Sequence, residues 1–173
     1  MAAAMLGIDP QSTELSIRSI VLPYFYRTEF FEGAARGYHD SSRVLIAQMP
    51  DGQLLPLGNR FGRRILISWF PPELQTDDLP AYAAVLAALD GDVARLGTAV
   101  TTMEDLPSWM RRWATENNVA VPPANVRDLG YGRFEVTTPI LADALFLVTA
   151  YIGERRFEDG IVKVELLIGS PPG

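Results

Sequence analysis

Hydrophobic and polar positions follow their clearest pattern in the last thirty residues of the chain. An apolar run over 144–152 is followed by a polar turn that ends in Asp159-Gly160, and then by an alternating run over 161–169. Two such runs around an Asp-Gly turn predict a β-hairpin. The first run is apolar on both faces, so we expect it to lie inside a sheet or to be covered twice.

The second run of this hairpin predicts a strand with one buried face and one wet face. Lys163 and Glu165 lie on the wet face, which is open to solvent or to a partner. The residues expected to face the core are Val162, Val164, Leu166 and Ile168. A further hairpin is predicted over 126–137, where a Gly-Tyr-Gly turn separates two short runs.

Three more strands are predicted over 43–49, 54–57 and 63–70. The turn at 50–53 contains proline and glycine, and the turn at 58–62 begins and ends with glycine. Short turns of this kind join neighbouring antiparallel strands, so these segments predict a meander.

Apolar residues at helical spacing predict two helices after Pro71-Pro72. The first covers 76–96, with Asp90-Gly91-Asp92 as a candidate break, and the second starts at a capping box formed by Thr101 and Glu104. The apolar positions are Tyr82, Val85, Leu86, Leu89, Val93 and Leu96 in the first helix and Leu106, Trp109, Met110 and Trp113 in the second.

The N-terminal quarter of the chain has a mixed pattern. Residues 1–13 are expected to form an extended arm, and the glycines and serines of 32–42 predict a loop. Residues 14–31 fit both a helical stripe and a β-branched, aromatic strand. Pro23 argues against an uninterrupted helix or a central strand, so we expect a short helix followed by an extended aromatic segment.

This order of elements predicts a single α+β domain over 1–173. We expect one antiparallel sheet of about five to seven strands, with two or three helices on one face, because strands and helices are segregated along the chain. A chain of 173 residues is long enough to bury a sizeable core without disulfides.

Composition excludes several kinds of site. The chain has no cysteine and one histidine, so thiolate chemistry and a His-rich metal site within one chain are ruled out. Its formal net charge of −6 disfavours binding to a nucleic-acid backbone. We expect no cofactor and no metal. Fourteen of the fifteen basic residues are arginines, which together with many alanines favours a bacterial or phage origin.

No signal peptide or membrane-spanning run is visible in the sequence. We therefore expect a cytoplasmic protein, or a component of a phage particle or of a secreted assembly that uses no signal peptide.

Arg60, Arg63 and Arg64 form the most suggestive local cluster. Together with Gly58 and Gly62, they could hold an anion with guanidinium groups and backbone N–H groups. A turn with solvated arginines at the start of a strand is the favoured interpretation, and the anion site is the alternative. No phosphate-binding glycine motif of known pattern is present.

His39-Asp40 lies in the predicted loop, with Tyr38 before it and Ser41-Ser42 after it. A histidine beside a carboxylate and a serine suits base-assisted nucleophilic catalysis. Catalytic triads are assembled in space rather than along the chain, so a surface histidine is the favoured interpretation and we assign no catalytic residue. The acidic pairs, such as Asp77-Asp78 and Glu104-Asp105, sit where helix caps and turns need carboxylates.

Aromatic residues supply the best candidate interface. Core packing accounts for most of them, but Tyr, Trp and Arg also dominate binding hot spots. The candidate interface residues are Tyr24, Tyr26, Trp109, Arg112, Trp113, Lys163 and Glu165.

The hypothesis drawn from these observations is a non-enzymatic protein–protein interaction or assembly subunit of a bacterial or phage multiprotein complex, which binds other subunits or itself. One alternative is an acidic immunity-type inhibitor of a basic toxin, because a net charge of −6 would steer association. Another is a small enzyme or ligand-binding domain with a pocket near His39 and Arg60/Arg63. No nucleic acid and no membrane insertion are expected.

Overall fold

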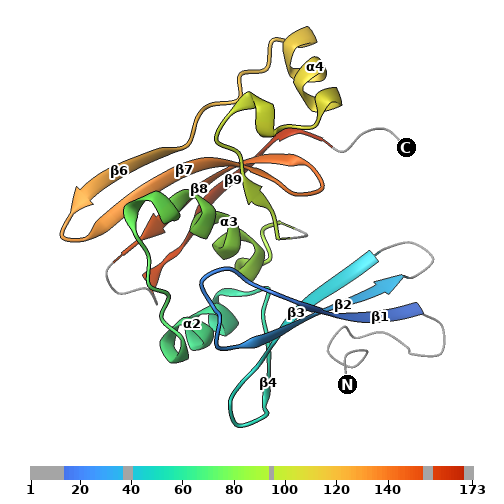
Figure 1. The fold of residues 1–173 in the computed structure, drawn as a ribbon, viewed down its shortest axis with the longest axis vertical. Coiled ribbons are helices and arrows are strands. Elements are labelled where there is room, and N and C mark those ends of the chain that lie inside the picture. The colour runs from blue at the N-terminus through green and yellow to red at the C-terminus, as the bar shows by residue number, and fades with distance from the viewer. Residues whose placement is uncertain (1–13, 37–40, 94–95, 154–157, 170–173) are drawn as a thin grey trace.

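The fold is seen in a computed structural model that describes residues 14–36, 41–93, 96–153 and 158–169 (Figure 1). The predicted arm over 1–13 lies outside these residues. The strands are β1 (Glu14–Ile20), β2 (Glu29–Arg36), β3 (Ser41–Gln48), β4 (Leu54–Pro56), β5 (Thr98–Ala99), β6 (Asn125–Gly130), β7 (Arg133–Leu141), β8 (Leu145–Ile152) and β9 (Gly160–Ile168). The helices are α2 (Arg60–Trp69), α3 (Leu79–Asp90) and α4 (Ser108–Glu116), with 3₁₀ turns η1 (Thr76–Asp78) and η2 (Met103–Asp105).

The strands form two antiparallel sheets rather than one. The first sheet has the order β1-β2-β3-β4, and the second has the order β5-β7-β8-β9 with β6 also paired to β7. Figure 1 shows the second sheet above the first along the long axis, with α3 between them and α4 beyond the second sheet. The α+β class is confirmed, and the number of strands is higher than the predicted five to seven.

The first sheet contains the largest departure from the predicted N-terminal structure. Segment 14–20 is not a helix but an edge strand, which pairs with β2 from Glu14↔Arg36 to Ile20↔Phe30. Much of the predicted loop over 32–42 is strand as well, because β2 also pairs with β3. Local spacing allowed either conformation here, and pairing with a neighbouring strand decided it.

Both predicted hairpins are present in the second sheet. β6 pairs with β7, and β8 pairs with β9, in antiparallel register. The prediction that 144–152 lies inside the sheet is confirmed, since β8 is bonded on one side to β7 and on the other to β9.

β9 departs from simple alternation because its register with β8 shifts twice. One shift lies opposite Thr149/Ala150 and the other opposite Leu145/Phe146, so Val162 and Leu167 have no register partner. The prediction that all four alternate apolar residues face the core is wrong for Val162 and Leu166, which are exposed. Lys163 and Glu165 are exposed as expected and form an ion pair with each other.

The predicted third strand of the meander, 63–70, is wrong, because residues 63–69 belong to helix α2 and Phe70 is its C-cap. Asn59 caps its N-terminus, with Oδ1 accepting a hydrogen bond of 2.8 Å from the N–H of Gly62. The buried residues recur at helical spacing: Gly62, Arg63, Leu66 and Ile67. The other two strands of the meander are present as β3 and β4.

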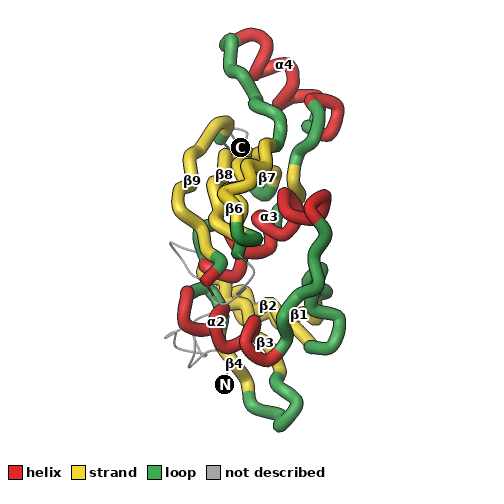
Figure 2. The backbone as a smooth tube through the Cα atoms, turned by 90° about the vertical axis from the view of Figure 1, so that its left-hand side faces the viewer, coloured by secondary structure: helices red, strands yellow, loops and turns green. Residues whose placement is uncertain are grey.

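Helix α3 is the centre of the main hydrophobic core. Nine of its residues are buried, and the core cluster around it includes residues of both sheets. The helix ends at Asp90 instead of continuing to 96, because Gly91 adopts φ 78° as a left-handed C-cap. Figure 2 shows α3 on one side of the second sheet and α2 below the lower part of β9.

Helix α4 lies at the far end of the second sheet (Figure 1). Leu106 and Met110 are buried in a small second core, whereas Trp109 and Trp113 remain exposed. The capping box is one residue later than predicted, at Thr102 and Asp105. None of the helices in the described segments is long and apolar enough to cross a membrane.

Candidate functional site

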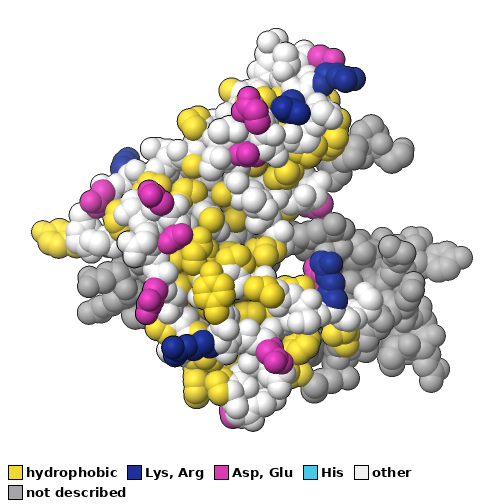
Figure 3. Space-filling view, in the orientation of Figure 1, with side chains coloured by type: hydrophobic (Ala, Val, Ile, Leu, Met, Phe, Trp, Pro, Cys, Tyr) yellow, Lys and Arg dark blue, Asp and Glu magenta, His cyan; other side chains and the backbone are white. Residues whose placement is uncertain are grey.

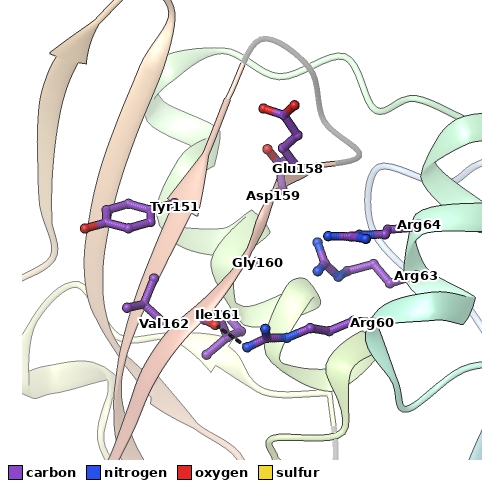
Figure 4. A pocket seen from close by; sticks show the side chains of 9 residues that line it. All are labelled: Arg60, Arg63, Arg64, Tyr151, Glu158, Asp159, Gly160, Ile161 and Val162. Atoms are coloured by element: carbon purple, nitrogen blue, oxygen red, sulfur yellow. Dashed lines mark hydrogen bonds between the residues drawn. The ribbon is translucent and has the colours of Figure 1, made fainter.

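A pocket of about 320 Å³ lies between helix α2 and the start of strand β9. Figure 4 shows three arginines reaching from α2 toward β9, with two acidic side chains on the other side. The lining residues are Arg60, Arg63, Arg64, Tyr151, Glu158, Asp159, Gly160, Ile161 and Val162. We call this space the α2–β9 pocket.

Arg60, Arg63 and Arg64 form one wall of the pocket, which we call the arginine wall, and Arg63 is its buried member. Its Nε donates to Oδ1 of Asp90 over 2.6 Å, and each side chain is only 2% exposed. The pairing is incomplete, because Arg63 Nη1 and Asp90 Oδ2 have no hydrogen-bond partner among the described residues. Buried groups of this kind are uncommon and costly. The charge of Arg63 is therefore balanced mainly by Asp90, with part of its donor capacity unused.

The close approach of Arg63 to β9 depends on a glycine. A Cβ atom added to Gly160 would lie 3.1 Å from Nη2 of Arg63, which is tighter than most real contacts. The absence of a side chain at Gly160 thus lets the guanidinium group come close to the strand.

Arg60 and Arg64 are exposed and differ in their contacts. Arg60 Nη2 donates to the carbonyl oxygen of Ile161 over 3.2 Å, so it ties α2 to β9. Arg64 has no hydrogen bond or ion pair with any side chain in the described part of the chain. Of the three arginines that line the pocket, Arg64 is therefore the one whose guanidinium group is most available to a ligand.

The opposite wall is acidic. Asp159 is buried, and its Oδ1 accepts a hydrogen bond of 2.7 Å from the N–H of Gly153. Glu158 is exposed at the edge of the pocket. The pocket is bipolar, with donors on the α2 side and acceptors on the β9 side (Figure 4).

Asp92 follows the C-cap of α3, and its carboxyl group interacts electrostatically with Asp90, Arg60 and Arg63. Burial raises the pKa of its carboxyl group, and the nearby Asp90 raises it further. Arg60 and Arg63 act in the opposite direction and lower that pKa. Asp92 thus belongs electrostatically to this cluster, although it does not line the pocket.

The outer face of α2 carries an apolar stripe beside the pocket. Phe61 is 74% exposed and Trp69 is 61% exposed, and Ile65 lies half-buried between them. The spacing i, i+4, i+8 places these three on one side of the helix, which we call the α2 stripe. Arg60 and Arg64 follow along one flank of the stripe.

No family model, no curated protein and no solved structure matches this chain.

The structure brings the predicted anion-site arginines together but separates the predicted interface residues. Arg60, Arg63 and Arg64 line one pocket, as the anion-site hypothesis requires, although Arg63 is committed to Asp90. The predicted interface residues are spread over the molecule. Helix α4, which carries Trp109, Arg112 and Trp113, lies at one end of the molecule (Figure 1), whereas Tyr26 lies in the connection between β1 and β2 of the first sheet.

Three of the predicted interface residues, Tyr24, Lys163 and Glu165, contact other side chains of this chain. Tyr24 is half-buried, with its ring edge-on to Tyr82 at 5.8 Å and its hydroxyl oxygen 3.5 Å from Asp78. Burial raises the pKa of Tyr24, with smaller contributions from Asp78 and Tyr26. Lys163 is paired with Glu165 on the open face of the second sheet.

The loop hypothesis around His39 falls outside the described residues, since 37–40 are not among them. The predicted carboxylate caps are partly seen. Asp78 Oδ2 accepts from the N–H of Gln75 over 2.8 Å, and Asp105 accepts from the N–H groups of Thr101 and Thr102 over 2.8 Å each. Within the described segments no group of three or more His, Asp or Glu side chains is placed to hold a metal ion.

The α2 stripe and the acidic wall of the pocket were missed by sequence reasoning. The stripe is not visible in the predicted structure, because Phe61 falls in the predicted turn at 58–62 and a strand over 63–70 would point Ile65 and Trp69 the same way as Arg63. The signal that could have found it is Asn59, an N-cap residue placed three positions before Gly62.

Proposed function

We propose that this chain is a non-enzymatic protein-binding subunit of a bacterial or phage multiprotein complex, and that it docks through the α2 stripe. The observation that carries this proposal is the exposure of Phe61 and Trp69 on one helix face, at 74% and 61%. Scattered apolar residues are normal on protein surfaces, but two large aromatic rings on one face of a ten-residue helix form a patch that water solvates poorly.

The surroundings of the stripe match the composition of a docking surface. Aromatic residues and arginine are enriched at the energetic centres of interfaces, and polar residues surround them. Here Phe61 and Trp69 supply the apolar centre, and Arg64 supplies a charged flank. The face drawn in Figure 3 has an apolar middle with scattered acidic side chains and, among its described residues, no extended patch of Lys or Arg.

The local charge at α2 bears on the immunity-inhibitor alternative. The whole chain is acidic, with a net charge of −6, but the flank of the stripe is basic. A basic toxin would be repelled by Arg60 and Arg64, so this face favours an acidic partner.

Site-specific photo-crosslinking in the source cells tests the proposal. A photoreactive phenylalanine analogue replaces Phe61, and the matched control places it at Tyr131, which is 92% exposed in the β6–β7 turn. We expect a defined covalent adduct from position 61 that is absent from position 131 and is lost when Trp69→Ser is added. Equal adducts from both positions, or none from position 61, would contradict docking through α2.

A further inference from the structure

We infer that the α2–β9 pocket binds a carboxylate side chain of the docking partner, with Arg64 as its principal donor. The source of the carboxylate rests on the proposed function, whereas the existence of a carboxylate site in the pocket does not. The pocket adjoins the stripe because Arg60 and Arg64 both line the pocket and flank Phe61 on α2.

The arginine wall has N–H donors that make no hydrogen bond within the described part of the chain. Arg64 is exposed and has no ion pair in the described part of the chain, and Arg60 uses Nη2 for the carbonyl of Ile161. Arg63 is buried next to them with Nη1 lacking a partner among the described residues. Planar guanidinium groups match the two oxygens of a carboxylate, and such charge-assisted hydrogen bonds are the strong ones.

The acidic wall determines where the carboxylate can bind. Asp159 is buried and accepts from the N–H of Gly153, while Glu158 is exposed and repels a second carboxylate. A bound carboxylate therefore lies toward α2, away from Glu158. The methylene groups of an Asp or Glu side chain would then pass over the exposed Tyr151 and Val162, which complete the lining.

The charge pattern favours an acidic partner over a second copy of this chain. Antiparallel packing of two α2 stripes would bring the Arg60 and Arg64 flanks of both copies together, and like charges across an interface are unfavourable. A partner with a carboxylate beside an apolar anchor satisfies both the stripe and the pocket.

Sodium acetate is the probe for the pocket itself. The full chain is titrated with acetate at neutral pH, against sodium chloride at equal ionic strength, while the arginine Nε–H signals are followed by NMR. We expect saturable shifts of the Arg64 and Arg60 signals with acetate and none with chloride. Arg64→Gln should weaken acetate binding about threefold or more, as expected for an exposed charge-assisted pair.

Two matched variants make this titration decisive. Glu158→Gln removes the opposing negative charge and should strengthen acetate binding, the reverse of Arg64→Gln. Arg111→Gln removes an exposed arginine of α4 at the far end of the molecule and should leave acetate binding unchanged. Shifts that do not saturate, or equal effects of Arg64→Gln and Arg111→Gln, would overturn the site.

Photo-crosslinking from position 61 tests whether the carboxylate belongs to the docking partner. Arg64→Glu should reduce the adduct at least threefold while Arg111→Glu leaves it intact. An adduct unaffected by Arg64→Glu would overturn the assignment of the carboxylate to the partner but leave the proposed function standing. Saturable acetate binding with no adduct from the parent protein would support the carboxylate site and reject docking through α2.

Discussion

The Nε atom of Arg63 lies 2.6 Å from Oδ1 of Asp90, and both side chains are 2% exposed. This contact joins the first turn of α2 to the last residue of α3. Since α3 packs against β7, β8 and β9, the ion pair also determines how α2 sits beside the second sheet. The walls of the α2–β9 pocket therefore depend on a buried charge pair 27 positions apart in sequence.

Removing one partner of this pair should be strongly destabilising. Arg63→Met leaves the Asp90 carboxylate buried without its cation, which typically costs about 3–5 kcal/mol. The double variant Arg63→Met/Asp90→Leu should recover much of that loss, because it buries no charge. Urea unfolding of both single variants and the double variant measures the coupling. As a comparison, Arg18→Met in the exposed pair with Glu32 should cost less than about 1 kcal/mol. Equal losses for Arg63→Met and Arg18→Met would contradict the buried pair.

Gly91 is required for two separate reasons. Its φ of 78° disfavours any residue with a Cβ, and an added Cβ would lie 2.7 Å from the carbonyl oxygen of Gly58. Gly52 has nearly the same φ, 81°, and open space around it. Gly52→Ala should therefore lower the free energy of unfolding by about 1 kcal/mol through the backbone alone. Gly91→Ala should lower it by at least about 1 kcal/mol more than Gly52→Ala, because the new Cβ also meets Gly58. Urea unfolding compares the two, and equal losses would mean that the close approach to Gly58 is not maintained.

Asp105 should contribute to stability only while it is ionised. Hydrogen bonds from Thr102 and Thr101 lower its pKa below the ordinary value of 3.8. A group whose folded-state pKa is lowered stabilises the fold above its unfolded-state pKa, and the contribution is lost as the pH falls through the folded-state value. We expect the free energy of unfolding to fall less steeply below about pH 4 in Asp105→Asn than in the parent protein. Parallel pH profiles for the two proteins would refute this role.

The two faces of α2 should respond differently to truncation. Leu66 is fully buried, so Leu66→Ala should cost about 2–5 kcal/mol in unfolding free energy. Phe61 is largely exposed, and Phe61→Ser should change stability by no more than about 0.5 kcal/mol. Denaturant unfolding of the two variants checks the orientation of the helix. A large loss from Phe61→Ser would place this ring in the core and remove the basis for the α2 stripe.

Strand pairs close in sequence were predictable because their patterns are local. The β6–β7 and β8–β9 hairpins join neighbouring segments through short connections, so alternation and turn residues suffice. The central place of β8 also follows from sequence, since a strand that is apolar on both faces needs cover on both. The two register shifts between β8 and β9 were not predictable, because they depend on how β9 fits against β8 and α3.

Helix α2 shows why local patterns can mislead. Residues 63–70 are rich in β-branched and aromatic side chains, which favours a strand when the segment is considered alone. The helical period becomes visible only when Arg63 is counted as a core residue together with Leu66 and Ile67. An arginine is buried only where a partner neutralises it, and that partner, Asp90, is supplied by another helix.

The sequence by itself determined the α+β class, the two C-terminal hairpins, the central helix and the clustering of three arginines at 60–64, because each depends on spacing within a short segment. Only the tertiary structure decided that the strands form two sheets, that 14–20 is a strand, and that Arg63 is buried while Arg64 is exposed. These outcomes depend on contacts between distant segments, such as the bond from Arg60 to Ile161 across 101 positions. The energy of those contacts outweighs the weak preferences of the local sequence.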